Sequence, residues 1–320
     1  MPNRFPIRTD LAVEARETTL SGSEAESISG VVYQQQEEDG GRIRISRVLV
    51  KNEKGAKALG KPKGNYLTVE AQDMWKNEGG IHREVSEALA HQIRALLKEA
   101  GLKKSSSVLV VGLGNPEVTS DSLGPQVLGN LRITRTLYAD GKISGIVPGV
   151  MAQTGMEAAE IVKGIVGETK PEAVIVIDAL AAKATQRLGR TVQLSDAGIV
   201  PGSGVGNARM ALDQDHLGIP VIAIGVPTVV EAATLCLDLL EEAGETAFDP
   251  ASASRGRSGS SPPETSTGRW KPLPASWALG SARPFMWIFP WKMWKSGSLN
   301  EIFDNVRQMM KKLPVSPRFF

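Results

Sequence analysis

The sequence predicts an α/β fold, with three α/β/α layers and a mostly parallel sheet. Between Val108 and Glu241, short apolar runs alternate with segments of helical periodicity. This alternation is typical of a parallel sheet that helices cover on both faces. Two runs, Val108–Val111 and Ala173–Ile177, are continuously apolar, as expected of strands that are buried on both faces.

Further elements complete the alternation. The expected strands are Ile143–Val147, Arg190–Leu194 and Ile219–Ile224, and the expected helices are Glu78–Gly101, Ser122–Ile133, Met156–Val166 and Val229–Glu242. Three loops rich in glycine and other turn-forming residues are Pro148–Gly155, Ser195–Asn207 and Gly225–Thr228. Ligands of open α/β sheets bind outside the carboxyl ends of the strands, so these loops are expected to surround a site there.

The two ends of the chain differ from this pattern. Residues 1–30 are polar and are predicted to form an exposed arm. Expected strands follow at Val31–Tyr33, Arg42–Lys51 and Tyr66–Glu70. We therefore predict an arm with a small N-terminal β subdomain over residues 11–76 and a catalytic core over 77–244. Residues 245–320 are rich in Ser, Pro and Trp and are predicted to be disordered or translated out of frame.

Composition restricts the functional class and the compartment. The formal net charge of +2 gives no indication of nucleic-acid binding. Cys236 is the single cysteine, which excludes an intrachain disulfide and favours a reducing compartment. The chain contains no apolar run long enough to span a membrane and no secretory signal, so a cytoplasmic location is expected.

Two carboxylates follow the two continuously apolar runs. Asp121 comes after Val108–Val111 and a turn containing Gly112 and Gly114, and Asp178 comes directly after Ala173–Ile177. Two close carboxyl groups share a proton, so one can activate water while the other protonates a leaving amine. This chemistry hydrolyses a peptide bond without a metal or cofactor. The alternatives are that Asp121 caps a helix and that Asp178 has a structural role at a strand end.

Other chemistries find less support in the sequence. The same oxygens could bind a metal with Asp196 or Glu157, although no histidine cluster indicates zinc. Glu117 stands where a dinucleotide-binding loop requires its third glycine. Ser203 lacks the flanking glycines of a nucleophile elbow, which disfavours a serine hydrolase.

Seven segments together resemble the germination proteases, the spore endopeptidases of endospore-forming bacteria. They are RTDLAVEA, VVGLGNPEVTSDSLGP, NLRITR, IVPGVMAQTG, IDALAAK, SDAGIVPGSGVGNAR and GIPVIAIGVPTVV. They run in family order from about Arg8 to Glu242. Residues 245–320 do not resemble the sequence that follows this point in the family.

The resemblance implies a core akin to the hydrogenase-maturation proteases, assembled as a homotetramer. It implies cleavage of the small acid-soluble proteins that coat spore DNA, in the forespore and spore core, with no cofactor, metal, membrane or direct nucleic-acid partner. The catalytic aspartates of the family fall on Asp121 and Asp178. The expected cleft-lining residues are Gly114, Asn115, Thr154, Asp196 and Ser203.

The resemblance also implies an inactive zymogen that cleaves itself at Asp10–Leu11, with residues 1–10 as its propeptide. Family substrates share an acidic–apolar–Ala–x–Glu layout, which here runs from Asp10 to Glu14. The arm therefore resembles a tethered substrate. Two alternatives are a metal-dependent maturation protease of related fold and a non-catalytic binder of the spore proteins.

Overall fold

A computed structural model of the chain describes residues 9–21, 27–71, 74, 81–103, 105–136, 142–202 and 209–230. Ser203, most of the expected helix Val229–Glu242 and the tail 245–320 lie outside these ranges. Among the helices that are described, none combines the length and apolarity needed to cross a membrane.

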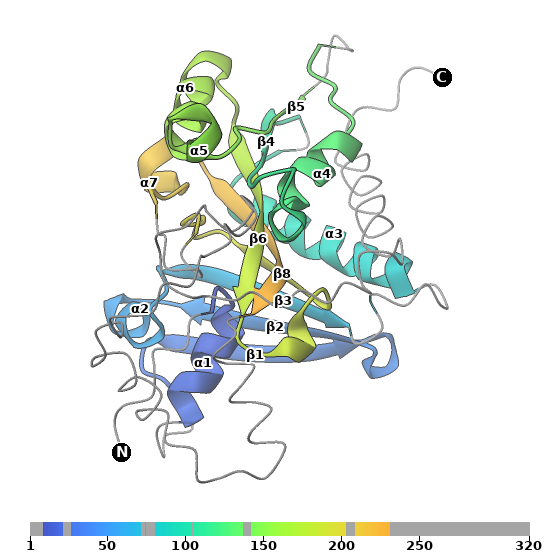
Figure 1. Cartoon of the computed structure of the whole chain (residues 1–320). Helices are drawn as coiled ribbons and strands as arrows, with labels where there is room; N and C mark the ends of the chain where they lie inside the picture. Colours follow the sequence, from blue (N-terminus) through green and yellow to red (C-terminus); the bar gives the residue numbers. More distant parts are fainter. Residues whose placement is uncertain are drawn as a thin grey trace, which may run out of the picture.

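The centre of the molecule is one eight-stranded sheet with the order β1-β2-β3-β7-β8-β6-β4-β5 (Figure 1). The strands are β1 (Val31–Glu38), β2 (Ile43–Val50), β3 (Gly64–Ala71), β4 (Val108–Gly112), β5 (Ile143–Ile146), β6 (Ala173–Ala182), β7 (Thr191–Ser195) and β8 (Val221–Val230). Strands β8, β6, β4 and β5 pair in parallel, whereas β1, β2, β3, β7 and β8 pair antiparallel.

Helices cover both faces of the parallel half, which confirms the predicted three-layer α/β fold. The helices are α1 (Ala12–Ser21), α2 (Glu53–Leu59), α3 (Ile81–Glu99), α4 (Leu123–Asn130), α5 (Met151–Thr154), α6 (Ala158–Thr169) and α7 (Gln214–Leu217), with 3-10 turns η1 (Asp39–Gly41), η2 (Thr119–Asp121) and η3 (Thr185–Arg187). The apolar sides of α3 and α4 share one core cluster with the sheet, and α6 packs in another on the opposite face (Figure 1).

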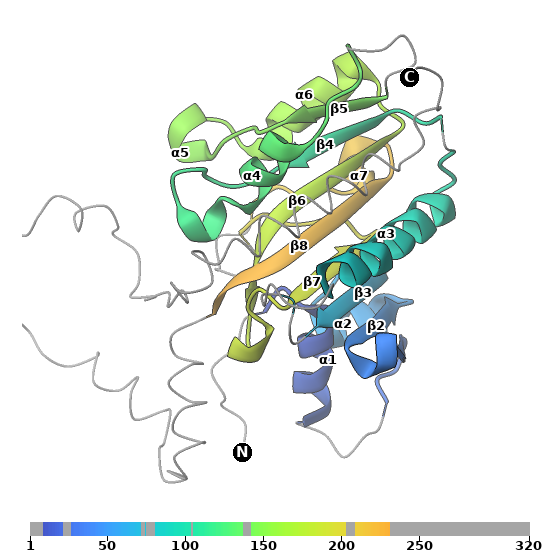
Figure 2. The ribbon, with the colours of Figure 1, turned by 90° about the vertical axis from the view of Figure 1, so that its right-hand side faces the viewer.

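The N-terminal strands continue the sheet of the core. β3 pairs with β7, with Val69 opposite Val192, so β1, β2 and β3 extend the same sheet (Figure 2). The side chains of Ile43, Ile45 and Val69 pack in the cluster that also contains α3. The division into ranges 11–76 and 77–244 stays a prediction.

Two strands run further than the sequence indicates. β6 continues through Asp178 to Ala182, so Asp178 lies inside the strand and not at its carboxyl end. β8 includes Gly225–Thr228, which was expected to be a loop. The two strands pair throughout this stretch, with Pro227 beside a register shift at Leu180/Ala181. Proline is tolerated at such irregularities, so strand pairing overrides the local loop signal.

The expectation of an exposed N-terminal arm is wrong for Leu11–Glu14. Leu11 and Ala12 are fully buried, and Glu14 is 1% exposed. The Glu14 carboxylate accepts hydrogen bonds from the backbone N–H groups of Lys183 (2.6 Å) and Ala184 (2.9 Å). Lys183 and Ala184 are remote from Glu14 in sequence. The polar local composition of the segment therefore does not indicate that Glu14 is buried.

We predict that Gly124→Ala destabilises the fold, because α4 approaches β4 too closely for a side chain. A Cβ atom at Gly124 would lie 2.3 Å from the Leu113 carbonyl oxygen and 2.5 Å from its nitrogen, and both are backbone atoms. Overpacking of this kind lowers the free energy of unfolding by about 1–3 kcal/mol, measured by denaturant unfolding. Gly129→Ala is the matched control, since it lies in the same helix with open space around it. Equal stability of both variants would contradict the prediction.

Candidate active site

Asp121 is held at the end of β4 by a tight turn. Gly114 has φ +110°, and a Cβ atom there would lie 1.9 Å from the Asp121 carbonyl oxygen, so the turn requires glycine. The backbone N–H of Asn115 donates to Asp121 Oδ2 at 2.8 Å. The carboxylate therefore fastens the loop after β4. It does not cap α4, whose N-cap position is Ser122.

Asp178 interrupts an apolar face of β6. Alternate residues on this face pack into two clusters: Val174 and Val176 lie with α6, while Leu180 and Ala182 lie with Leu11 and Val13. Side chains alternate between the faces of a strand, which places Asp178 between these clusters. It is 7% exposed, and the N–H of Ala179 donates to its Oδ1 at 2.9 Å.

Asp121 and Asp178 line the same cavity, which has a volume of about 350 Å³. Its walls come from the loop after β4, the start of α5, the second half of β6, residues 199–202 and the end of β8. Gly149 and Met151 belong to the expected Pro148–Gly155 loop, and Thr228 belongs to the expected Gly225–Thr228 loop. Segments from three expected loop regions thus meet at the two aspartates.

The two carboxyl groups have unlike electrostatic environments. Burial raises the pKa of Asp121, while the Asn115 N–H and the positive charge of Arg209 oppose the rise. Burial raises the pKa of Asp178 well above its ordinary value, and the negative charge of Asp121 raises it further. The N–H of Ala179 opposes this shift, and the charge of Asp10 adds to it. Asp178 is therefore favoured as the protonated member of the pair.

Some of the other residues expected to line the cleft lie at the cavity, and others do not. Gly114 lines the cavity, whereas Asn115 is not a lining residue and donates its backbone N–H to Asp121, which is one. Thr154 is not among the lining residues, since its hydroxyl caps the turn between α5 and α6. Asp196 binds the backbone and side-chain nitrogens of Asn65 at 2.6 Å each, away from this cavity.

Sequence reasoning missed that Asp10 and Arg209 also line the cavity. Asp10 is bound to β6: its N–H donates to the Ala181 carbonyl oxygen, and the Ala181 N–H donates to its Oδ2, both at 2.9 Å. The sequence marked Asp10 only through its place before Leu11. In the part of the chain that is described, no group of three or more His, Cys, Asp or Glu side chains is arranged to hold a metal ion.

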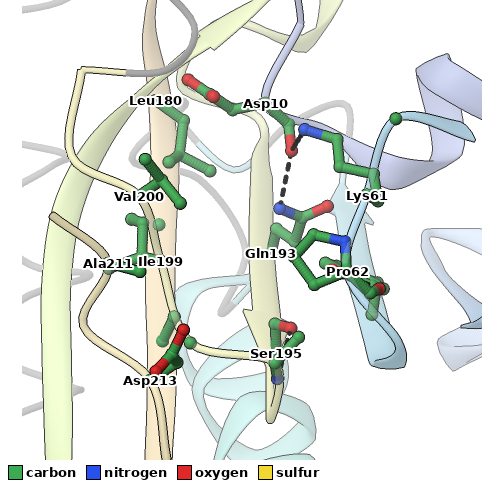
Figure 3. Close-up of a pocket in the computed structure, with 16 residues that line it drawn as sticks. Asp10, Lys61, Pro62, Leu180, Gln193, Ser195, Ile199, Val200, Ala211 and Asp213 are labelled. Atoms are coloured by element: carbon green, nitrogen blue, oxygen red, sulfur yellow. Dashed lines mark hydrogen bonds between the residues drawn. The ribbon is translucent and has the colours of Figure 1, made fainter. Parts of the chain in front are cut away.

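A second cavity of about 140 Å³ adjoins the first and shares Asp10, Leu180, Ile199 and Val200 with it. Figure 3 shows the side chains of Lys61 and Gln193 directed at the main chain of Asp10. Asp10 therefore lies between the aspartate cavity and this neighbouring cavity.

Comparison with known proteins gives several extensive matches. The chain is 46% identical over 252 residues to a germination protease of Geobacillus sp. (strain WCH70), covering 74% of this chain and 67% of the relative. It is 48% identical over 244 residues to that of Caldanaerobacter subterraneus subsp. tengcongensis, covering 73% and 72%. The germination protease of Bacillus subtilis (strain 168) is 44% identical over 248 residues, covering 75% and 67%.

A solved structure, the [NiFe] hydrogenase maturation protease HycI from Thermococcus kodakarensis KOD1, is 19% identical with a TM-score of 0.29, covering 38% of this chain and 74% of that one. The family model described as "Germination protease" matches residues 8–243. This match spans the paired aspartates, the segment that carries Asp10 and every strand of the sheet. The chain belongs to the germination protease family.

Proposed function

We propose that this chain is an endopeptidase that starts the degradation of small acid-soluble DNA-coating proteins in the spore core. Membership of the germination protease family makes it a spore protease. The observation that carries the proposed mechanism is the pairing of Asp121 and Asp178 in one cavity, where the charge of one raises the pKa of the other. Such coupling is typical of carboxylate pairs that share a proton.

The unlike environments of the two acids support different roles for them. Asp178 is the more deeply buried and has negative neighbours, so it holds the proton and acts as general acid. Asp121 faces the positive charge of Arg209, so it is the ionised base. Asp121 removes a proton from a water molecule that attacks the substrate carbonyl, and Asp178 gives its proton to the leaving amine.

Exposed apolar side chains in and near the cavity favour a polypeptide as its ligand. Val118 and Met151 line it and are 45% and 37% exposed. Met156 and Met210 are 50% and 42% exposed and lie beside α5 and Arg209. Flexible methionine side chains adapt to varied apolar partners, which supports binding of a protein substrate rather than one small molecule.

The proposal includes self-processing of a zymogen at Asp10–Leu11 and assembly as a homotetramer. The support for self-processing is that Asp10 lines the aspartate cavity in the intact chain and is fastened to Ala181 there. Loss of residues 1–10 would vacate that place on β6. The tetramer rests on the resemblance alone, and light scattering of the purified chain tests it.

We expect Asp121→Asn and Asp178→Asn each to lower cleavage of purified small acid-soluble spore proteins at least about 100-fold, because general acid–base catalysis contributes at least this much. Fragments are measured by mass spectrometry. Asp215→Asn, at an exposed position of α7, is the matched control.

Full activity of either site variant would refute the catalytic pair. Activity that chelators abolish and zinc or nickel restores would favour a metal-dependent protease, and binding without fragments would favour a non-catalytic binder.

The raised pKa of Asp178 predicts a stability effect with a definite sign. A carboxyl group whose folded pKa exceeds its unfolded pKa loses stability as the pH rises from the ordinary aspartate value through the raised one. Asp178→Asn removes this penalty and should therefore increase the melting temperature at pH 7. The gain should vanish below the ordinary aspartate pKa. A lower melting temperature than wild type at pH 7 would contradict it.

We predict that Asp10→Ala slows release of residues 1–10, because the variant loses the acid before the bond and the hydrogen bond to the Ala181 N–H. Electrophoresis of the purified chain over time measures the rate. Asp39→Ala, in the turn between β1 and β2, is a control that leaves this contact intact. Processing at the wild-type rate would count against the cleavage site.

A further inference from the structure

The carbonyl oxygen of Asp10 receives two side-chain hydrogen bonds from distant parts of the fold. Lys61 Nζ and Gln193 Nε2 each lie 3.0 Å from this oxygen (Figure 3). Lys61 follows α2, and Gln193 lies in the middle of β7. A cation and an amide N–H thus converge on the carbonyl group of the Asp10–Leu11 peptide bond.

The orientation of Gln193 is set by the main chain. The backbone N–H of Ala12 donates to Gln193 Oε1 at 2.7 Å. An N–H group requires an acceptor, so the oxygen of the amide must face Ala12 and its NH₂ group must face Asp10. Gln193 is 8% exposed, which excludes most water from these bonds. One side chain therefore contacts the main chain on both sides of the Asp10–Leu11 bond.

Lys61 is held in place for the same contact. Gly60 ends α2 in a left-handed conformation, and the Lys61 N–H donates to the Ala56 carbonyl oxygen. The Tyr66 hydroxyl donates to the carbonyl oxygen of the neighbouring Pro62. Lys61 Nζ also donates to the Thr9 carbonyl oxygen at 3.0 Å. Burial lowers the pKa of Lys61, although the charges of Asp10 and Glu14 oppose the shift.

Several other contacts hold the N-terminal segment (residues 9–21) on the core. Leu11 and Val13 are buried in an apolar cluster, and Glu14 is bound by two backbone N–H groups and by Arg187 at 3.3 Å. Burying an ammonium group against neutral carbonyl oxygens costs desolvation free energy, which makes it an unfavourable contact for docking alone. The same arrangement stabilises the negative charge that develops on a carbonyl oxygen during hydrolysis.

We propose that Lys61 and Gln193 form an oxyanion site for cleavage of the Asp10–Leu11 bond, an inference that rests on the self-processing in the proposed function. Both donors already lie 3.0 Å from the carbonyl oxygen of the intact bond, on which the negative charge would develop. Asp10 also lines the cavity of Asp121 and Asp178, so the residue that the two donors contact borders the cavity of the two acids.

The reaction needs one water molecule and no other reactant. Asp121 takes a proton from water as the water oxygen bonds to the Asp10 carbonyl carbon, and the carbonyl oxygen gains a negative charge between Lys61 and Gln193. When this intermediate collapses, the C–N bond to Leu11 breaks and Asp178 protonates the leaving nitrogen. The products are a carboxyl group on Asp10 and an amine on Leu11.

The experiment follows self-cleavage of the full chain by mass spectrometry, scoring the fragment that begins at Leu11. Lys61→Met removes the cation, and Lys61→Arg keeps one. Gln193→Glu keeps the acceptor for the Ala12 N–H but loses the donor to Asp10, so we expect it to fold more readily than Gln193→Leu, which loses both. Lys57→Met, exposed in α2, and Gln34→Leu, exposed in β1, are the matched controls. Melting temperatures identify variants that are only unstable.

We expect Lys61→Met and Gln193→Glu to slow self-cleavage by about 100-fold or more, the loss found when one oxyanion donor is removed. Lys61→Arg should recover much of the rate, which a purely structural role would not require. Self-cleavage at control rates in folded Lys61→Met and Gln193→Glu, while Asp121→Asn blocks it, would overturn the oxyanion site alone. Self-cleavage that continues in Asp121→Asn would instead overturn the proposed function, and absence of self-cleavage in the unchanged chain would overturn both.

Discussion

The buried carboxyl group of Asp178 is the constraint on which the site depends. A carboxylate removed from water is strongly destabilising unless it is protonated or paired with a cation. Asp178 has a backbone N–H as its donor and the negative charges of Asp121 and Asp10 nearby, so protonation is the route that this environment favours. The fold tolerates this because β6 and β8 are continuous on either side and hold the group between two apolar clusters. The placement that is unfavourable for stability is the one that would supply a proton donor at neutral pH in the proposed mechanism.

The N-terminal segment and the site are parts of one assembly. Glu14 binds the backbone directly after β6 and pairs with Arg187, which also binds Glu17 and Glu70. Arg187 thereby ties α1 to β3 and to the turn that follows β6. Since β3 joins β7 in the sheet, the N-terminal strands provide the frame on which Asp10 is held beside the aspartate cavity.

The sequence predicts the parts of this structure whose signals are local. Continuous apolar runs identify β4 and β6, because a strand that is buried on both faces has no polar alternation. The same argument gives the wrong end for β6, because a carboxylate after a run of apolar residues indicates a strand end and Asp178 lies inside the strand. The contacts of Asp10 were beyond local reasoning: its bonds to Lys61 and Gln193 join residues 51 and 183 positions apart. These bonds depend on how the N-terminal segment docks on the core, and the periodicity of apolar residues in the sequence does not indicate this docking.

The edge of β6 explains why the N-terminal segment lies beside the aspartates. β4 pairs with β6 only as far as Gly112 opposite Ile177, whereas β6 runs on to Ala182. Beyond that point its outer peptide groups have no partner strand in β4, and those of Ala181 bind Asp10 instead. Early termination of one parallel strand therefore has two consequences: it opens the cavity that Asp121 and Asp178 line, and it leaves main-chain groups that another polypeptide can bind. In the proposed function, main-chain groups of this kind would set the path of the bound chain, and apolar walls such as Met151 and Val118 would select its side chains.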